Sequence, residues 1–140
     1  MSKKFKFILS TPEAVLFDGE AEYVGLTTPQ GEIGIMADHI PIVSLISAGS
    51  MKIVSSKGEQ ILATGGGFVK ITPEKIIAFT QTAEFAESID EKRVIEAMKD
   101  AKQKMQEQVD EVSLADATAL LERNIARLKT LERKKKRSHH

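Results

Sequence analysis

The sequence predicts an α+β fold, in which an N-terminal antiparallel β-sandwich is followed by a C-terminal hairpin of two helices. Two observations support this prediction. Apolar residues alternate in short runs before residue 88, whereas after it they recur every three or four residues. Turn residues such as Asp18-Gly19 and Thr28-Pro29 separate the runs of the first part, and such turn signals vanish in the second.

Residues 1–87 are accordingly assigned to the sandwich and residues 88–136 to the helical hairpin. Ser56–Glu59 and Thr72–Lys75 are expected to be the turns of two β-hairpins. Short strands joined in this way are typical of antiparallel sandwiches and barrels. The expected strands centre on Phe5–Leu9, Val15–Phe17, Tyr23–Leu26, Met51–Val54, Gln60–Ala63, Phe68–Ile71 and Ile76–Phe79.

Residues 31–41, Gly-Glu-Ile-Gly-Ile-Met-Ala-Asp-His-Ile-Pro, form the most distinctive segment. Gly31 and Gly34 permit unusual backbone angles, and Pro41 fixes its own φ angle. We therefore expect a tightly shaped loop between short strands. One carboxylate of this segment, Glu32, and one imidazole, His39, are expected at its rim.

The first helix is expected to start at a capping box, Ser88-Ile89-Asp90-Glu91. A short break at Val109–Ser113 then leads into a second helix with a weaker cap at Ser113–Asp116. Two amphipathic helices with a short connection favour an antiparallel helical hairpin. Its apolar faces are Val94, Met98, Ala101 and Met105 in the first helix, and Leu114, Ala117, Leu121, Ile125 and Leu128 in the second.

Both helical stripes are narrow, and they are rich in Ala and Met. Such a hairpin buries little apolar area by itself, and isolated helices gain most of their stability from packing. A ligand could therefore hold the hairpin closed, or a partner could release it, at a small difference in free energy.

The composition restricts the class of protein. The chain has 140 residues, 41% hydrophobic and 29% charged, which suits one domain or a small domain with an appendage. The absence of Cys excludes disulfides, thiolate metal sites and a Cys nucleophile. No apolar run approaches the ~18 residues of a membrane span. The basic N-terminus continues into a strand-like alternation instead of a signal-peptide core, so a cytoplasmic location is expected.

The formal net charge of zero hides an asymmetry between the two parts. Residues 1–87 carry seven Lys/Arg against ten Asp/Glu, whereas residues 88–140 carry thirteen against ten. Most of the basic excess lies at residues 129–137, where cations suit the C-terminal dipole of a helix. Residues 137–140, Arg-Ser-His-His, resemble the start of a purification tag and are left out of functional reasoning.

Two other classes of protein were considered. A basic helical end could bind nucleic acid, but the chain lacks Trp, has one Tyr and shows no basic sandwich face. An enzyme is disfavoured because His39 is the one histidine outside the tag-like segment, and no Ser/His/Asp set or metal-ligand spacing is readable. The sequence therefore predicts neither nucleic-acid binding nor catalysis.

Five ordered segments give the chain its resemblance to a known family. The family is the epsilon subunit of bacterial F-type ATP synthase, and the resemblance extends from about Phe5 to Leu131. The segments are Gly31–Ile35, His39–Pro41, Gly49–Ile53, Gly65–Phe68 and Ile89–Arg93.

The resemblance implies a non-catalytic rotor subunit of the central stalk, on the cytoplasmic face of the cell membrane, that couples the catalytic head to the c ring. In this family the sandwich binds the gamma subunit and sits on the ring of c subunits. The hairpin is permissive when contracted on the sandwich, and it inhibits ATP hydrolysis when it extends toward the catalytic alpha and beta subunits. Neither a membrane span nor a required cofactor is implied.

By the same resemblance, Glu32 and His39 lie on the loop that faces the c ring. A carboxylate and an imidazole there could bond polar groups of the c subunits. The alternatives are that Glu32 is a solvated charge and that His39 bonds its own turn. Gly31, Gly34 and Gly65–Gly67 are expected to serve backbone geometry, since the downstream Lys-Ser/Thr of a phosphate loop is absent.

Some bacterial members bind ATP in the contracted hairpin, so ATP is expected as a regulatory ligand. The residues that match the family motif are Glu84, Asp90, Arg93, Arg123 and Arg127. The last two stand at i, i+4, ~6 Å apart on one helical face, and such guanidinium groups can grip a polyphosphate.

The chain departs from that motif at two positions. Val94 replaces a small residue, and Asp100 stands where ATP-binding relatives place an arginine. In the alternative interpretation, Asp90 caps the first helix and the three arginines are solvated or salt-bridged, which contributes ~0–1 kcal/mol per pair.

Overall fold

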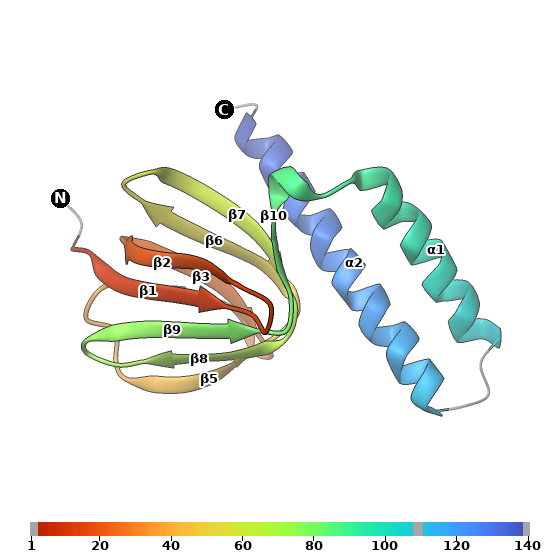
Figure 1. Cartoon of the computed structure of the whole chain (residues 1–140), viewed down its shortest axis with the longest axis horizontal. Coiled ribbons are helices and arrows are strands. Elements are labelled where there is room, and N and C mark those ends of the chain that lie inside the picture. Colours follow the sequence, from red (N-terminus) through yellow and green to blue (C-terminus); the bar gives the residue numbers. More distant parts are fainter. Residues whose placement is uncertain (1–2, 108–110, 139–140) are drawn as a thin grey trace.

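The computed structural model describes residues 3–107 and 111–138, which form a sandwich of two five-stranded sheets followed by two packed helices (Figure 1). Sheet A has the strand order β2 (Val15–Ala21), β1 (Phe5–Ser10), β9 (Lys75–Thr80), β8 (Gly67–Ile71) and β5 (Ile42–Ile46). Sheet B has the order β10 (Ala83–Phe85), β7 (Gly58–Thr64), β6 (Gly49–Ser55), β3 (Tyr23–Thr28) and β4 (Gly31–Ile35).

The predicted fold class is confirmed. Both predicted hairpins are present, as β6–β7 and β8–β9, and neighbouring strands are antiparallel with one exception. β1 and β9 run parallel, which the hairpin pattern did not predict because the two strands are far apart in sequence.

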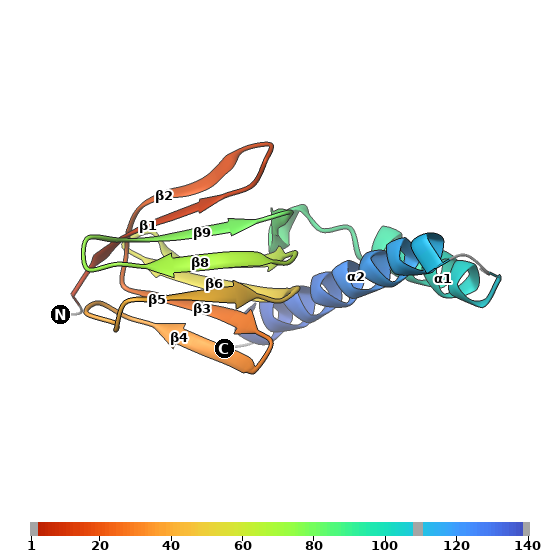
Figure 2. The ribbon, with the colours of Figure 1, turned by 90° about the horizontal axis from the view of Figure 1, so that it is seen from below.

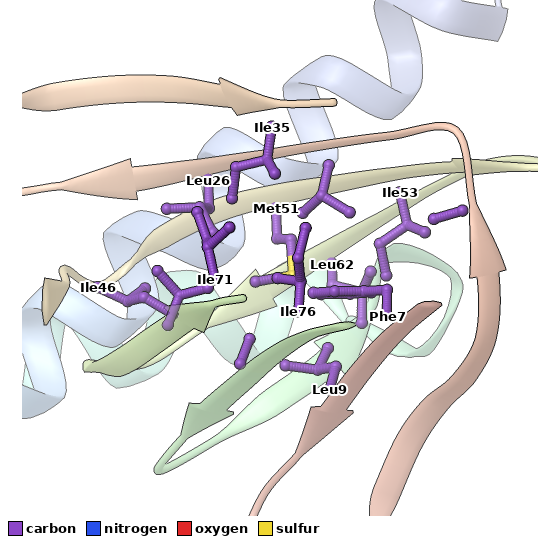
Figure 3. Packing of buried hydrophobic residues seen from close by; sticks show 14 residues of the cluster. Phe7, Leu9, Leu26, Ile35, Ile46, Met51, Ile53, Leu62, Ile71 and Ile76 are labelled. Carbon is purple, nitrogen blue, oxygen red and sulfur yellow. The ribbon is translucent and has the colours of Figure 1, made fainter. Parts of the chain in front are cut away.

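The core lies between the two sheets, and alternate residues of each strand supply it (Figure 3). Both sheets contribute residues that are at most 1% exposed and are therefore removed from water: Phe7 of sheet A, and Leu26, Met51 and Leu62 of sheet B. The Phe7 and Phe17 rings pack with their centroids 5.7 Å apart. Burial of this kind supplies most of the sandwich's stability.

Part of the segment expected to be a loop is a strand. Gly31–Ile35 forms β4, which pairs with β3, and only the residues between β4 and β5 form the loop. Gly25 and Gly34 face each other across this pair, and the Tyr23 ring lies over both. A Cβ at Gly34 would come within 2.8 Å of that ring. The glycines therefore make room for an aromatic side chain that covers the strand pair.

The helices begin at positions other than those predicted. A short 3-10 helix, η1 (Ala86–Ser88), precedes α1 (Glu91–Glu107). Asp90 caps α1, because its Oδ1 accepts from the backbone N–H groups of Lys92 at 3.0 Å and Arg93 at 3.3 Å. The predicted Ser88 capping box is therefore wrong: Ser88 ends η1. α2 (Glu111–Ser138) starts before the second predicted cap, and residues 109–110 of the predicted break lie outside the described residues.

The hairpin rests on sheet B through α2. The later part of α2 packs on β6, β7 and η1, whereas α1 packs mainly on α2. Figures 1 and 2 show both helices projecting beyond the end of the sandwich. No helix of the described residues is long and apolar enough to cross a membrane.

The buried face agrees with the prediction in α1 and differs from it in α2. Val94 and Ala101 of α1 are buried, as expected. In α2, two residues of the predicted stripe, Leu114 and Ile125, are 39% and 38% exposed. Ala117 of that stripe is buried as expected, and the other buried positions among the described residues of α2 are Asn124, Ala126, Thr130 and Leu131.

Gly67 allows β8 and β9 to approach closely, and we expect Gly67→Ala to destabilise the sandwich. A Cβ there would lie 1.9 Å from the backbone oxygen of Phe79. Because the obstacle is backbone, the strands must separate, and overpacking of this kind costs about 1–3 kcal/mol or more. The free energy of unfolding, measured by urea denaturation, tests this.

Gly66→Ala is the matched control, since a Cβ at Gly66 meets nothing closer than 3.5 Å. This neighbouring variant is expected to be nearly neutral, or slightly stabilising through the unfolded state. Equal stability of the two variants would contradict the assigned role of Gly67.

Candidate functional site

One predicted pair of site residues is brought together at the junction of sandwich and hairpin. Glu84 of β10 pairs with Ala63 of β7, which fixes its backbone beside α2. Its Oε1 accepts from Nε of Arg127, and the two side chains are only 30% and 28% exposed. Arg127 also donates to the amide oxygen of Asn124 at 3.0 Å. The Arg127 guanidinium is thus held in place by one residue of the sandwich and one of its own helix.

Two buried polar residues of α2 support this junction. Asn124 donates to the backbone oxygen of Leu120 at 2.8 Å, and Thr130 donates to that of Ala126 at 2.8 Å. The Thr130 hydroxyl also lies 3.3 Å from the backbone oxygen of Leu62 in β7. Both polar side chains are fully buried. Sequence reasoning missed them because polar residues do not contribute to an apolar stripe, although Asn124 lies seven residues after Ala117 and seven before Leu131.

Arg123 lies one turn before Arg127 and lines a cavity of about 340 Å³. Three loops of the sandwich form the opposite wall, at Ser47–Ala48, Gly65–Gly66 and Gln81–Thr82. A carboxylate, Glu122, shares the α2 side of this cavity. Arg123 and Arg127 are therefore placed along one side of α2 at the sandwich's end, as the i, i+4 spacing predicted.

Asp90 and Arg93 form a separate pair at the start of α1. Their closest charged atoms are 3.8 Å apart, and the Arg93 side chain is 87% exposed. Asp90 acts as a helix cap, as the alternative interpretation held, and Arg93 reaches into solvent. Of the departures from the ATP-binding motif, Val94 is buried and Asp100 is exposed.

Glu32 is in strand β4, and its carboxylate accepts from Arg133 near the end of α2. The same part of α2 carries Lys135, whose Nζ lies 3.1 Å from Oε2 of Glu91 at the start of α1. The end of α2 is therefore joined to the sandwich and to α1 by ion pairs. Neither pair could be read from sequence, because the partners are 101 and 44 residues apart.

His39 lies beyond the other end of β4, in the loop that leads to β5. Its Nδ1 is 2.8 Å from the backbone oxygen of Ile40, so it bonds its own turn. The preceding residue, Asp38, has a φ of 66° and accepts from Nζ of Lys3 at 2.8 Å. That hydrogen bond raises the pKa of Lys3 above its usual value. Glu32 thus lies near the start of β4, and His39 lies beyond its end.

The outer face of sheet A carries an exposed apolar strip. Leu45 of β5 and Phe68 of β8 are directly paired, and they are 66% and 45% exposed. Phe68 stacks on Phe79 of β9 with ring centroids 5.8 Å apart. Val43, 69% exposed, extends the strip along β5. We call Val43, Leu45, Phe68 and Phe79 the sheet A strip.

Within residues 3–107 and 111–138, no three His, Cys, Asp or Glu side chains are grouped so that they could hold a metal ion. The features that stand out are an arginine pair on α2, ion pairs that join the hairpin to the sandwich, and an uncovered apolar strip. All of these suit binding to another molecule.

Family comparisons decide the identity of the chain. Residues 4–86 match the beta-sandwich domain of the ATP synthase Delta/Epsilon chain, and residues 87–132 match the long alpha-helix domain of the same chain. The chain belongs to the ATP synthase delta/epsilon family. As an epsilon chain, it is a non-catalytic subunit of ATP synthase.

Bacterial epsilon chains resemble it over nearly their whole length. The ATP synthase epsilon chain of Chromobacterium violaceum is 38% identical over 141 residues, covering 99% of this chain and all of that one. The epsilon chain of Bacillus licheniformis is 31% identical over 126 residues, covering 90% of this chain and 96% of that one.

Solved ATP synthases contain chains with the same fold. One chain in the Euglena gracilis mitochondrial ATP synthase (OSCP/F1/c-ring) has a TM-score of 0.75 and 21% identity, covering 85% of this chain and 76% of that one. A chain in the central stalk/c-ring structure of the Tetrahymena thermophila enzyme has a TM-score of 0.59 and 14% identity, covering 93% and 98%. At this identity the likeness concerns the fold alone.

Proposed function

We propose that this epsilon chain is a rotor subunit of the central stalk that couples the catalytic head to the c ring and regulates ATP hydrolysis through its helices. It works as a peripheral part of the synthase, on the cytoplasmic face of the cell membrane, where the complex couples hydrogen ion transport to ATP synthesis. The observation that carries this proposal is that the two sheets have different surroundings. The hairpin packs on sheet B, while the sheet A strip is exposed.

The gamma subunit is the partner proposed for the sheet A strip. Isolated exposed apolar residues are ordinary, but a contiguous apolar patch marks an interaction surface. Leu45 and Phe68 are cross-strand neighbours, and Phe79 continues the row onto a third strand. A flat apolar strip on a rigid sheet suits a permanent subunit contact, because little order is lost when a partner binds.

The c ring is the partner proposed for the end of the sandwich that carries the β4–β5 loop. Met36 and Ile40 of this loop are 58% and 75% exposed, while the Asp38 hydrogen bond holds its backbone. His39 is proposed to shape this loop, since its Nδ1 is hydrogen-bonded to the backbone oxygen of Ile40. Glu32, which lies near the other end of β4 and is paired with Arg133, is not part of this proposed contact.

Regulation is proposed to depend on release of the hairpin from sheet B. The α2 residues buried there are mostly small or polar, and the buried amide of Asn124 and hydroxyl of Thr130 are satisfied within the helix. Separation of α2 therefore leaves both polar groups with a hydrogen-bond partner inside the helix. Such an element can exist in two states of similar free energy, and the catalytic alpha and beta subunits are the proposed partners of the extended state.

ATP is proposed as a second, regulatory ligand of the closed hairpin. The favouring observation is that Arg127 and Arg123 lie along one side of α2, Arg123 at the wall of a cavity between α2 and the sandwich. In the closed form Glu84 neutralises Arg127, so a polyphosphate would take the place of that carboxylate. Asp90 and Arg93 at the start of α1 are proposed to complete the site.

Co-purification with the gamma subunit tests the proposed function most directly. The two chains, co-expressed with a tag on gamma alone, are expected to elute together in a 1:1 ratio by size-exclusion chromatography with light scattering. An independent enzyme or a nucleic-acid-binding protein would elute alone. Recovery of gamma without this chain would overturn the proposal.

A further inference from the structure

The last part of α2 is held to two different elements by side-chain charges. Arg133 pairs with Glu32 of β4, and Lys135 pairs with Glu91 of α1. We propose that these two ion pairs form a salt-sensitive clasp that sets the fraction of molecules whose hairpin is closed on the sandwich. The clasp rests on the two-state hairpin proposed above, but not on the gamma or ATP contacts, because it is formed within one chain.

The geometry of the two pairs explains why both are needed. Arg133 and Lys135 are two residues apart, and successive residues of a helix are turned by ~100°, so the two side chains leave α2 ~200° apart. One therefore reaches the sandwich and the other reaches α1. The end of α2 is held between them, and opening the clasp frees α2 from sheet B and α1 from the end of α2 (Figure 1).

The rest of the interface offers few bonds that resist opening. In this half of α2, Asn124 and Thr130 keep hydrogen bonds to their own helix whether or not the sandwich is present. Among the described residues, the polar contacts from this half of α2 to the sandwich include the Arg127–Glu84 pair and the hydrogen bond from Thr130 to Leu62. Of the residues that the structure describes in this half of α2, the buried apolar side chains are Ala126 and Leu131, so weak charge pairs can decide the balance.

Exposure makes the clasp weak and sensitive to salt. The Arg133 and Glu32 side chains are 43% and 58% exposed, and those of Lys135 and Glu91 are 62% and 47% exposed. Pairs of this kind contribute at most about a fivefold change in an equilibrium constant. They are screened by salt, since the Debye length is ~10 Å at 0.1 M. If the closed and open forms of the hairpin have similar free energies, such a small contribution changes their relative populations measurably.

Distance measurements between two spin labels on the isolated full-length chain can count closed and open molecules. The chain has no Cys, so Lys57→Cys in the β6–β7 turn and Asp116→Cys on α2 would provide two unique labelling sites. Double electron–electron resonance is expected to give one distance for the closed form and a second, broader population for the open form. Raising the salt concentration from 0.02 to 0.5 M, roughly a fivefold fall in Debye length, is expected to increase the open population.

Variants on this labelled background isolate the clasp. Glu32→Gln and Arg133→Gln are each expected to lower the closed-to-open ratio about two- to fivefold and to weaken its salt dependence. Exchanging the charges, as Glu32→Arg with Arg133→Glu, is expected to restore both. Lys129→Gln is the control, because it also removes a positive charge from α2. Lys129 forms none of the six ion pairs found among the described residues, so this variant should behave as wild type.

Two results would overturn the clasp. One is a closed-to-open ratio that stays at the wild-type value, with the same salt dependence, in both single variants. The other is a charge exchange that leaves the molecule as open as the single variants, because the effect would then not come from pairing. Loss of gamma binding in a separate experiment would bear on the proposed function alone.

Discussion

ATP titrated into the isolated chain is expected to release heat, and replacing both Arg123 and Arg127 by alanine is expected to lower its affinity at least about 100-fold. Each guanidinium offers charge-assisted hydrogen bonds worth about 1.5–3 kcal/mol, and a loss of about 3 kcal/mol is already more than 100-fold in affinity. Isothermal titration calorimetry is the measurement. Lys75→Ala, which removes a positive charge at the start of β9, is the control and should bind ATP as wild type does.

A second pair of variants separates loss of contact from new repulsion. Removing Arg127 alone leaves the Glu84 carboxylate, only 30% exposed, without its partner and facing any phosphate that enters. Arg127→Ala combined with Glu84→Gln removes that repulsion while the phosphate contact stays absent. We expect this double variant to bind ATP more tightly than Arg127→Ala and more weakly than wild type. Absence of heat from the wild type at millimolar ATP would contradict the proposal that ATP binds this chain.

The sequence predicted the elements that have strong local patterns. The strands of the two hairpins, β6–β7 and β8–β9, are short apolar runs joined by short turns, so local propensity and tertiary structure agree. β4 was missed because Gly31 and Gly34 read as loop residues. What makes this segment a strand is the pairing with β3 and the Tyr23 ring that covers Gly25 and Gly34, and these contacts are tertiary.

In the helices too, local sequence patterns predicted only some of the side chains that tertiary contacts bury. The α1 face was predicted correctly because Val94 and Ala101 are apolar and buried. The α2 face was predicted only in part. Ala117 is buried as expected, but Asn124 and Thr130 are also buried, with their hydrogen bonds satisfied inside the helix, whereas Ile125 is partly exposed. An apolar stripe cannot reveal a buried face that is made of small and polar residues.

The candidate site could be named from the sequence only through the family resemblance. Spacing placed Arg123 and Arg127 on one side of α2, but nothing local indicated that Glu84 would meet Arg127 or that Arg133 would meet Glu32. These pairs depend on where α2 lies on the sandwich. That placement follows from packing against β6 and β7, which no short-range pattern encodes.

Placing charge on the sheet A strip is expected to abolish assembly with the gamma subunit. Leu45→Glu and Phe68→Glu each put a carboxylate where the interface is expected to be dry, and an unpaired buried charge costs several kcal/mol. Losses of about 3 kcal/mol or more correspond to at least a 100-fold lower affinity, so co-purification should fail. Both side chains are exposed in the isolated chain, so thermal unfolding should change little.

Ile95→Glu is the matched control for this experiment. Ile95 is 41% exposed, close to the 45% of Phe68, but it lies on α1 and not on sheet A. The control should co-purify with gamma at the wild-type ratio. The strip variants should also retain whatever ATP affinity the wild type shows, because no residue of the sheet A strip lines the Arg123 cavity. Normal recovery of Leu45→Glu and Phe68→Glu with gamma would mean that the subunit docks through a different surface, and the bare strip would then need another occupant.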